Sequence, residues 1–253
     1  MSSMPDDLRQ QLGAAFAAGG PQYDELRPGY PDAAVQWLVG STPAGARVAD
    51  IGAGTGKLTA QLVDRGFDVV AVDPSEDMLD QLRRRLPSVQ IHVGRGESTS
   101  LAPGSVDLAT FAQSWHWVDV AAGTAELHRI IRPGGAVAMV WNFLDVRVDW
   151  VAELAAIWHT LATRESIDAT RHVPALGEGF PPVQTTTVDW EHTTSINALA
   201  ALVTTRSYYL TAAADQQQQI RDRVTAFVQD RFAGQATVGL PYRTHCYRVC
   251  RGT

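Results

Sequence analysis

Short apolar runs alternate with amphipathic stretches through the first 145 residues of the chain. The apolar runs have the length and composition of buried strands, and they span 48–51, 67–73, 89–93, 106–113 and 136–141. The stretches between them carry apolar residues every three or four positions, which predicts helices that begin near Pro31, Lys57, Pro74 and Val118. This alternation is typical of an α/β fold with a doubly wound, parallel sheet.

The pattern changes beyond Val148. An aromatic-rich helical stretch, Trp150 to Leu161, precedes a polar segment and then a run of period-two character from Val183 to Glu191. Two more helices and a last strand are predicted, at 198–210, 214–232 and 242–249, and a weaker helical pattern covers 8–18. We therefore expect a Rossmann-like sheet of about seven strands, mostly parallel, with an antiparallel strand near the C-terminus and a helical cap.

One glycine-rich loop dominates the chemistry of the chain. The run V-A-D-I-G-A-G-T-G-K, from Val48 to Lys57, predicts a strand that reaches the carboxylate Asp50, then a turn, then a helix. The turn contains three glycines, Gly52, Gly54 and Gly56. They leave the backbone open to close approach by a ligand. Asp73 ends the next strand, where doubly wound folds hold ribose hydroxyls. A nucleoside-containing ligand is therefore predicted across the ends of these two strands.

The spacing of the loop discriminates between nucleotides. Dinucleotide sites usually have G-x-G-x-x-G, and P-loops have G-x-x-x-x-G-K-[ST]. Here Ile51 and Leu58 occupy the positions at which a P-loop needs a glycine and a hydroxyl. An acidic residue ahead of the glycines suits a cationic ligand and would repel a pyrophosphate. The alternative is a tight strand-to-helix turn in an unrelated α/β protein.

Other reactive and aromatic residues fall where the ligand crevice is expected. The crevice of a parallel sheet lies outside the carboxyl ends of its strands. The fourth predicted strand runs directly into Gln113, Trp115, His116 and Trp117. We expect these residues at the reacting end of the site, and aromatic sealing of the core is the alternative. A Pro- and Gly-rich segment holds Tyr23, Arg27 and Tyr30, and it is either a surface loop or a flap over the ligand.

Composition narrows the range of partners. The net charge of −6 argues against nucleic acid, which needs a basic face. Lys57 is the only lysine, so Schiff-base chemistry is not expected. Cys246 and Cys250 lack His or Cys partners at ligand spacing, so no metal site is expected. With neither a secretory signal nor an apolar run of membrane-spanning length, the sequence predicts a cytoplasmic protein without a membrane partner.

Several motifs occur together in a characteristic order: R-P-G-Y-P, D-I-G-A-G-T-G-K-L, V-D-P-S-E-D-M-L, A-Q-S-W-H-W and R-I-I-R-P-G-G. In this order they resemble the class I S-adenosylmethionine-dependent methyltransferases, in the small-molecule subgroup similar to trans-aconitate and ubiquinone/menaquinone methyltransferases. The resemblance implies one domain, 1–253, with an N-terminal flap (1–43), a cofactor-binding core (44–145) and C-terminal strands with cap helices (146–253).

The resemblance also implies roles for individual residues. The cofactor is expected to contact the loops at the strand ends and the flap, at Asp50, Gly52, Ala53, Gly54, Gly56, Asp73, Pro74, Met78, Gly96, Glu97, Ala112, Gln113, Tyr23 and Arg27. The acceptor is expected to contact Tyr30, Trp115, His116, Trp117, Trp141 and Arg206. Arg95 departs from the family pattern, because many relatives carry an Asp there for the adenine amino group.

The reaction implied is in-line displacement of the methyl group by an oxygen, nitrogen or carbon of a small-molecule acceptor. His116 is the candidate base. A carboxylate acceptor would need no base, and Arg27 or Arg206 would then anchor it. Two other functions are weighed: an NAD-dependent oxidoreductase, and a non-catalytic cofactor-binding module. The chain is expected to be a monomer or a homodimer.

Overall fold

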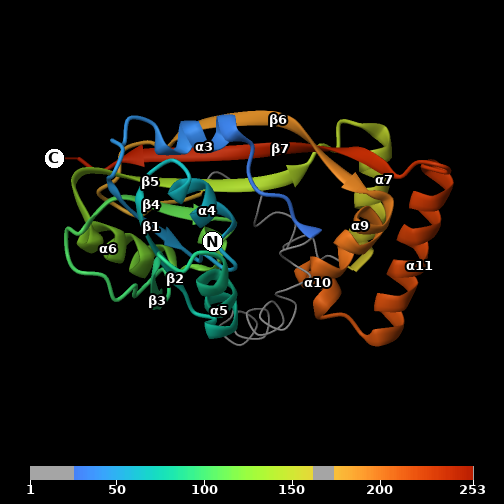
Figure 1. Ribbon diagram of the computed structural model, residues 1–253, viewed down its shortest axis with the longest axis horizontal. Helices are drawn as coiled ribbons and strands as arrows, with labels where there is room; N and C mark the ends of the chain where they lie inside the picture. Colours follow the sequence, from blue (N-terminus) through green and yellow to red (C-terminus); the bar gives the residue numbers. More distant parts are fainter. Residues whose placement is uncertain (1–25, 162–173, 253) are drawn as a thin grey trace.

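The computed structural model describes residues 26–161 and 174–252, so the helix predicted at 8–18 and Tyr23 lie outside the described residues. Within these ranges seven strands form one sheet, in the order β3-β2-β1-β4-β5-β7-β6 (Figure 1). The strands are Arg47–Ile51 (β1), Asp68–Asp73 (β2), Gln90–Val93 (β3), Val106–Ala112 (β4), Ile131–Leu144 (β5), Gln184–Ser195 (β6) and Thr237–Cys250 (β7).

The direction of the strands confirms the predicted mixed sheet. β1 to β5 pair in parallel with one another, and β7 is antiparallel to both of its neighbours, β5 and β6. The chain passes from β1 outward to β2 and β3, and then returns to the other side of β1 with β4. Such a reversal of strand order leaves a crevice at the carboxyl ends of the strands, where ligands of doubly wound folds bind.

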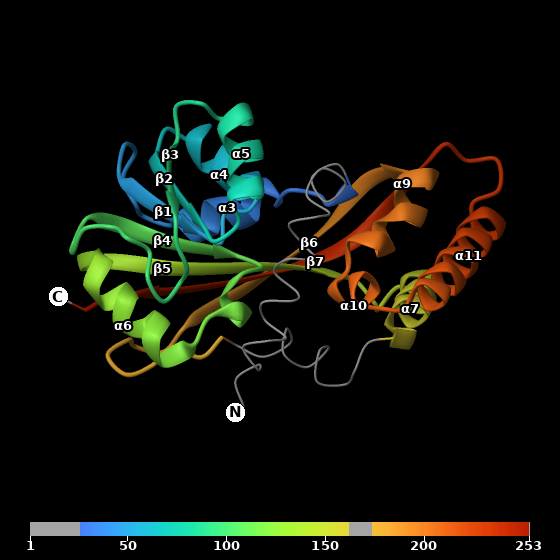
Figure 2. The same ribbon diagram turned by 90° about the horizontal axis from the view of Figure 1, so that it is seen from below.

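Helices cover both faces of this sheet (Figure 2). α3 (Asp32–Val39), α4 (Lys57–Val63) and α5 (Glu76–Arg85) lie on one side, and α6 (Val120–Ile130) lies on the other. Because side chains alternate along a strand, Leu108 of β4 packs in the core with α3 and α4, whereas Ala109 packs in the core with α6. Both faces are therefore buried, as the apolar strands predicted.

β6 and β7 extend beyond the rest of the sheet into a second group of helices (Figure 1). Residues 237–241 of β7 pair with β6 alone, 242–248 pair with both β6 and β5, and 249–250 pair with β5 alone. The cap comprises α7 (Asp149–Trp158), η2 (His159–Leu161), α9 (Ile196–Ala201), η3 (Leu202–Thr205), α10 (Ser207–Leu210) and α11 (Ala214–Arg231). Its helices share a core with Leu240 and Tyr242 of β7. No helix in the described part of the chain is long and apolar enough to cross a membrane.

The prediction of a single helix at 198–210 is wrong. The chain instead forms α9, η3 and α10, with Arg206 in an extended conformation (φ −89°, ψ 140°) between the last two. The hydroxyls of Thr204 and Thr205 donate to the carbonyls three residues earlier, at 2.8 Å each. Side-chain hydrogen bonds of this kind compete with the backbone hydrogen bonds of an α-helix. Here they occur where α9 narrows into the 3₁₀ helix η3 and where η3 ends.

The R-P-G-G run, 132–135, lies inside β5 as an irregularity. Val106 pairs with Ile131, but Leu108 pairs with Ala136, so β5 carries three extra residues between the two pairs. Gly134, at φ +77°, supplies the left-handed backbone that this bulge contains.

Candidate functional site

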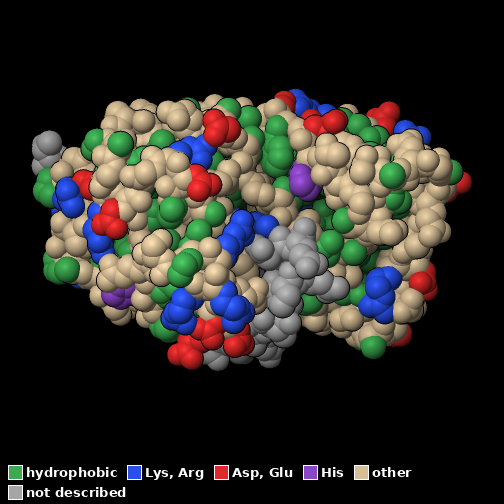
Figure 3. All heavy atoms as spheres, in the orientation of Figure 1, with side chains coloured by type: hydrophobic (Ala, Val, Ile, Leu, Met, Phe, Trp, Pro, Cys, Tyr) green, Lys and Arg blue, Asp and Glu red, His purple; other side chains and the backbone are tan. Residues whose placement is uncertain are grey.

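A cavity of about 1120 Å³ lies at the carboxyl ends of β1, β2, β4 and β5 and extends to the cap. Small-molecule sites usually measure about 300–1,000 Å³, so this one has room for a cofactor and a second molecule. On the face drawn in Figure 3, acidic and basic side chains are interspersed.

The glycine loop forms one end of the cavity. Gly52 and Gly54 have φ of +71° and +56°, and both line the cavity together with Ala53. A Cβ on Gly52 would lie 2.4 Å from the Cβ of Ser114, whose hydroxyl donates to the Ile51 carbonyl at 2.7 Å. The ends of β1 and β4 therefore meet so closely that only a glycine fits.

Gly56 does not line the cavity. A Cβ there would lie 2.8 Å from Cγ of Leu82 on α5. Its left-handed backbone (φ +86°) precedes the start of α4, and its lack of a side chain lets α4 and α5 pack closely. The structure therefore gives Gly56 a packing role, and its contact with the cofactor stays a prediction.

Asp73 is buried at the end of β2, on the cavity wall. Its Oδ2 accepts from the Gly54 N–H at 2.9 Å, and its Oδ1 accepts from the Ser75 N–H at 2.8 Å. Burial raises the pKa of this carboxyl, and the two backbone N–H groups oppose that rise. One carboxylate thus fixes the glycine loop and the start of α5, where Pro74 and Met78 also line the cavity.

Asp50 is not on the cavity wall, contrary to its predicted contact with the cofactor. It is fully buried behind the glycine loop. The Thr59 hydroxyl of α4 donates to its Oδ2 at 2.6 Å, and the Thr110 hydroxyl of β4 donates to its Oδ1 at 3.0 Å. Burial raises its pKa to about 6, against these two hydrogen bonds. From this position the Asp50 carboxylate can reach a ligand in the cavity only through its charge and through the loop that it supports.

The end of β4 brings the predicted aromatic and His cluster to the site. Ala112 and Gln113 line the cavity, and Gln113 has a positive φ of 55°, unusual for a residue with a side chain. A 3₁₀ turn, η1 (Trp115–Trp117), follows. Its three residues per turn send successive side chains in different directions. Trp115 therefore packs in the core, edge-on to Phe111 with ring centroids 4.8 Å apart. The sequence predicted that Trp115 would lie at the reacting end of the site, but it does not line the cavity.

His116 and Trp117 do line the cavity, together with Trp141 of β5. The rings of His116 and Trp117 lie 4.7 Å apart. The Trp141 Nε1–H donates to Nδ1 of His116 at 3.3 Å. Burial lowers the pKa of His116 to about 4. The imidazole is therefore neutral near pH 7.

The segment before α3 crosses the cavity wall, which favours the flap over the surface loop. Arg27 donates to the Thr205 hydroxyl at 3.0 Å and to the Thr205 carbonyl at 2.8 Å, in the cap. Gln61 of α4 bonds both the N–H and the carbonyl of Tyr30, at 3.1 and 2.7 Å. Arg27 and Tyr30 both line the cavity.

The loop after β3 supplies Arg95, Gly96 and Glu97 to the cavity wall. A Cβ on Gly96 would lie 2.5 Å from Cγ2 of Val118, so this glycine allows the loop to approach the start of α6. Glu97 accepts from the Asp119 N–H at 2.8 Å and joins the same two segments.

The cap supplies residues that sequence reasoning missed. Trp158 of α7 and Tyr208 of α10 line the cavity beside Arg206, whose guanidinium carbon lies 5.0 Å from the Trp158 ring centroid. The Trp158 Nε1–H and the Tyr208 hydroxyl are buried without a hydrogen-bond partner among the described residues. Tyr208 lies two residues after Arg206, which the sequence analysis had placed at the acceptor site, and this proximity was the only signal for it. The sequence pattern of Trp158 indicated only an apolar position on a helix.

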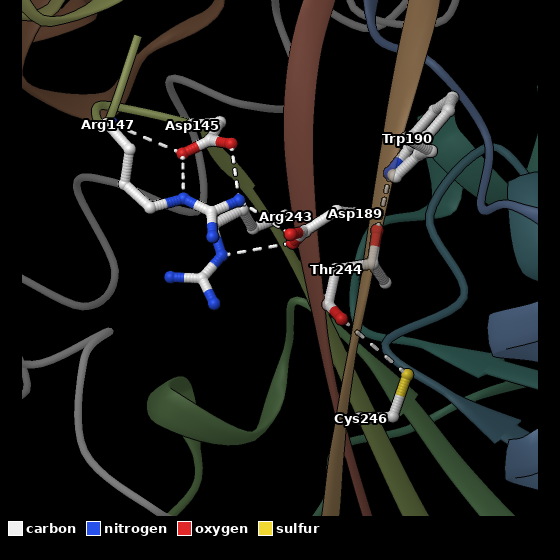
Figure 4. A network of polar contacts seen from close by, with 7 residues as sticks. All are labelled: Asp145, Arg147, Asp189, Trp190, Arg243, Thr244 and Cys246. Carbon is white, nitrogen blue, oxygen red and sulfur yellow. Dashed lines mark hydrogen bonds and ion pairs between the residues drawn. The ribbon is translucent and has the colours of Figure 1, made fainter.

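An ion-pair network lies near the end of β5 and supplies Asp145, Arg147 and Arg243 to the cavity wall (Figure 4). Arg147 bonds Asp145 at 2.7 Å and Asp189 of β6 at 2.5 Å, and Arg243 of β7 bonds Asp189 at 3.1 Å. Beside it, the Trp190 indole donates to the Thr244 hydroxyl at 2.7 Å. The four charged groups balance one another, so this part of the wall carries little net charge.

The described residues fit an adenosyl sulfonium. The glycine loop offers an open backbone at the cavity, Asp73 is suited to a ribose diol, and Asp50 and Asp73 make this end acidic. Arg27 and Arg206 make the opposite end of the cavity, which the cap lines and which we call the cap lobe, basic. A cationic cofactor is thus favoured at one end and an anionic molecule at the other.

Comparison with known proteins agrees with this geometry. A family model described as a methyltransferase domain matches residues 49–139. An uncharacterized methyltransferase of Mycobacterium tuberculosis is 42% identical over 244 residues, which cover 95% of this chain and 97% of the relative. A malonyl-[acyl-carrier protein] O-methyltransferase of Serratia marcescens is 29% identical over 178 residues, 69% of this chain and 66% of the relative.

Among solved structures, a protein of Anaeromyxobacter dehalogenans described as a type II methyltransferase is 26% identical, with a TM-score of 0.61. The match covers 89% of this chain and 96% of that one. The comparisons do not support the oxidoreductase alternative. The near full-length match to the mycobacterial relative, on this fold and with this loop, means that the chain belongs to the S-adenosylmethionine-dependent methyltransferases.

Proposed function

We propose that the chain transfers the methyl group of S-adenosylmethionine to an oxygen of a small acceptor that is already an anion, a carboxylate in the simplest case. The cofactor would be held by residues of the strand ends, Gly52, Ala53, Gly54, Asp73, Pro74, Met78, Gly96, Glu97, Ala112 and Gln113. The acceptor would lie between these and the cap.

The observation that carries this proposal is a surplus of donors in the cap lobe. The Trp158 Nε1–H and the Tyr208 O–H are buried with no acceptor among the described residues. A buried donor without a partner costs about 1–3 kcal/mol, so a ligand that supplies acceptor atoms would relieve that cost at both positions. An anionic oxygen group supplies acceptors and no donors.

Positive charge supports the same class of acceptor. Burial raises the pKa of the Tyr208 hydroxyl, and Arg206 and Arg27 oppose the rise, so both cations act at this hydroxyl. Arg206 is stacked on Trp158, which restrains its planar guanidinium. A guanidinium restrained in this way is preorganised to bind a carboxylate.

The charges of the two ends also suit the reaction. When bound, S-adenosylmethionine supplies a methyl group on a cationic sulfur that leaves as a neutral thioether. The residues of this chain then have to align an anionic oxygen with that methyl group and exclude water. The ion pair is neutralised in the transfer and no proton moves. A phenol would first have to lose a proton, and the lowered pKa of His116 makes it a weak base. The O-methyltransferase name of the Serratia relative agrees with an oxygen acceptor.

The test is a panel of carboxylates, phenols and amines incubated with methyl-labelled cofactor, with products identified by mass spectrometry. Methyl esters are expected. Tyr208→Phe should raise the KM for the carboxylate about tenfold, the effect of losing one hydrogen bond to a charged group. Tyr209→Phe is the matched control, because its hydroxyl bonds Arg221 within the cap and its side chain does not line the cavity.

Transfer to phenols or amines with none to carboxylates would refute the proposed acceptor class. Equal KM values in Tyr208→Phe and the unaltered protein, with normal cofactor binding, would remove Tyr208 from the acceptor site.

A further inference from the structure

The hydrogen bond between Trp141 and His116 determines which ring nitrogen of His116 carries a proton. An indole N–H only donates, so Nδ1 of His116, which accepts it at 3.3 Å, must present a lone pair. A neutral imidazole with a bare Nδ1 has its proton on Nε2. Nε2 is then the nitrogen that remains for a ligand, and it is an N–H donor.

The surroundings keep Trp141 in this orientation. Its side chain is buried at the end of β5, and it packs edge-on against Tyr247 of β7, with centroids 5.6 Å apart and an interplanar angle of 80°. Rotation of the indole away from His116 would require Tyr247 to move as well. Trp117 also packs against the imidazole, with ring centroids 4.7 Å apart. Two indoles therefore contact the ring, and one of them specifies its tautomer.

We propose that Trp141 is a positioning residue that holds His116 as the neutral Nε2–H tautomer, so that His116 binds the acceptor oxygen as a hydrogen-bond donor and does not take its proton. For His116 to act as a base through Nε2, the proton would have to sit on Nδ1, against the Trp141 N–H. Protonation of Nδ1 creates the same conflict between two donors, and burial also opposes a charge on the ring. The inference rests on the proposed function and refines it: the acceptor must bind already deprotonated.

The direct test is NMR of ¹⁵N-histidine-labelled protein bound to S-adenosylhomocysteine at pH 7, with the His116 signals identified by their loss in His116→Gln. Nδ1 should resonate as an unprotonated nitrogen and Nε2 as a protonated one. Trp141→Phe should raise the pKa of His116 and allow a proton on Nδ1. Trp117→Phe removes the other indole and should leave the wild-type tautomer. A wild-type ring with its proton on Nδ1, or one that is charged at pH 7, would overturn the proposal.

Turnover of the best carboxylate of the panel separates a donor from a base. Gln keeps an N–H donor but is no base, whereas Leu is neither. We expect His116→Gln to stay within about tenfold of the unaltered rate and His116→Leu to fall on the order of 100-fold. Equal losses in the two variants, or a rising limb near pH 6–7 that disappears in His116→Gln, would show proton removal and would overturn the proposal.

The two proposals fail in different ways. If no carboxylate is methylated but the ring carries its proton on Nε2, the acceptor class is wrong and the tautomer assignment stands. If the ring carries its proton on Nδ1, the inference about Trp141 fails whatever the acceptor is.

Discussion

Replacing Asp50 by Asn should change stability in opposite directions at low and at neutral pH. The carboxyl is fully buried, and burial raises its pKa from 3.8 to about 6, with a further contribution from Asp73. An acid with a higher pKa in the folded than in the unfolded protein lowers stability as pH rises. Below pH 3.8 it is protonated in both states and contributes nothing. Above about pH 6 the loss is complete, and at 1.36 kcal/mol per pKa unit it amounts to about 3 kcal/mol.

Asn removes this pH-dependent loss but weakens the local hydrogen bonds. Its oxygen can accept from the Thr59 hydroxyl, and its amide can donate to the Thr110 hydroxyl, which then donates to the Ala49 carbonyl 3.4 Å away. Below its pKa the folded carboxyl is itself neutral, so Asn exchanges the hydrogen bonds of a neutral acid for those of an amide with less suitable geometry, which costs about 1 kcal/mol. Because the unfolded carboxyl is already half ionised near pH 4, Asp50→Asn should be less stable than the unaltered protein by about 0.5 kcal/mol there, and more stable by about 2 kcal/mol at pH 7.5.

Urea unfolding of the cofactor-free protein, followed by tryptophan fluorescence at both pH values, measures the two free energies. Thr59→Val is the companion variant: it removes the 2.6 Å hydrogen bond to the carboxylate, and it should cost more stability at pH 7.5 than at pH 4. Parallel stability-versus-pH curves for Asp50→Asn and the unaltered protein would refute the reasoning.

Three further outcomes are expected. Gly52→Ala should destabilise the protein by about 3 kcal/mol, and Gly45→Ala, with a similar φ of +76° but open space around it, by only about 1 kcal/mol; equal losses in thermal unfolding would deny the close contact at the loop. Asp73→Asn should weaken binding of S-adenosylhomocysteine about 10- to 100-fold by calorimetry, and the exposed Asp80→Asn should not, because an amide accepts poorly from two backbone N–H groups and a ribose. Arg147→Gln should lower the free energy of unfolding, and by less in high salt, because the Arg147 guanidinium and Asp189 are half exposed, whereas Asp145 is buried. Its hydrogen bonds lower the pKa of Asp145 and Asp189, so this contribution is present above pH 3.8 and lost in acid; a loss that persists at low pH would contradict it.

Local spacing was enough to predict the part of the site that is built from consecutive residues. The run from Val48 to Lys57 and the position of Asp73 obey rules of strand ending, turn and helix start that act over a few residues, and the structure has the same elements there. Orientation was harder to predict. Trp115 and His116 are neighbours in sequence, but a 3₁₀ turn directs one into the core and the other to the cavity.

The acceptor end could not be predicted because it is assembled from distant residues. Trp158 and Tyr208 are fifty residues apart, and they meet beside Arg206 only because the cap helices fold back over the ribbon of β6 and β7. The apolar periodicity predicted a helix at α7, but it counts Trp158 only as an apolar residue and takes no account of its indole N–H. Likewise, the break at Arg206 depends on threonine hydroxyls that bond carbonyls, which a pattern of apolar spacing does not record.

The continuity of β6 and β7 limits how small molecules enter and leave. Both strands run unbroken from the sheet into the cap, so the two ends of the cavity are joined by a ladder of backbone hydrogen bonds and not by a flexible linker. A swing of the cap as a rigid body would break many of those bonds at once. Exchange should therefore proceed by rearrangement of wall side chains and of the short stretch around Arg27, which is attached through individual side-chain bonds. The distance between the ends is then set by the backbone, and it limits how long an acceptor can be.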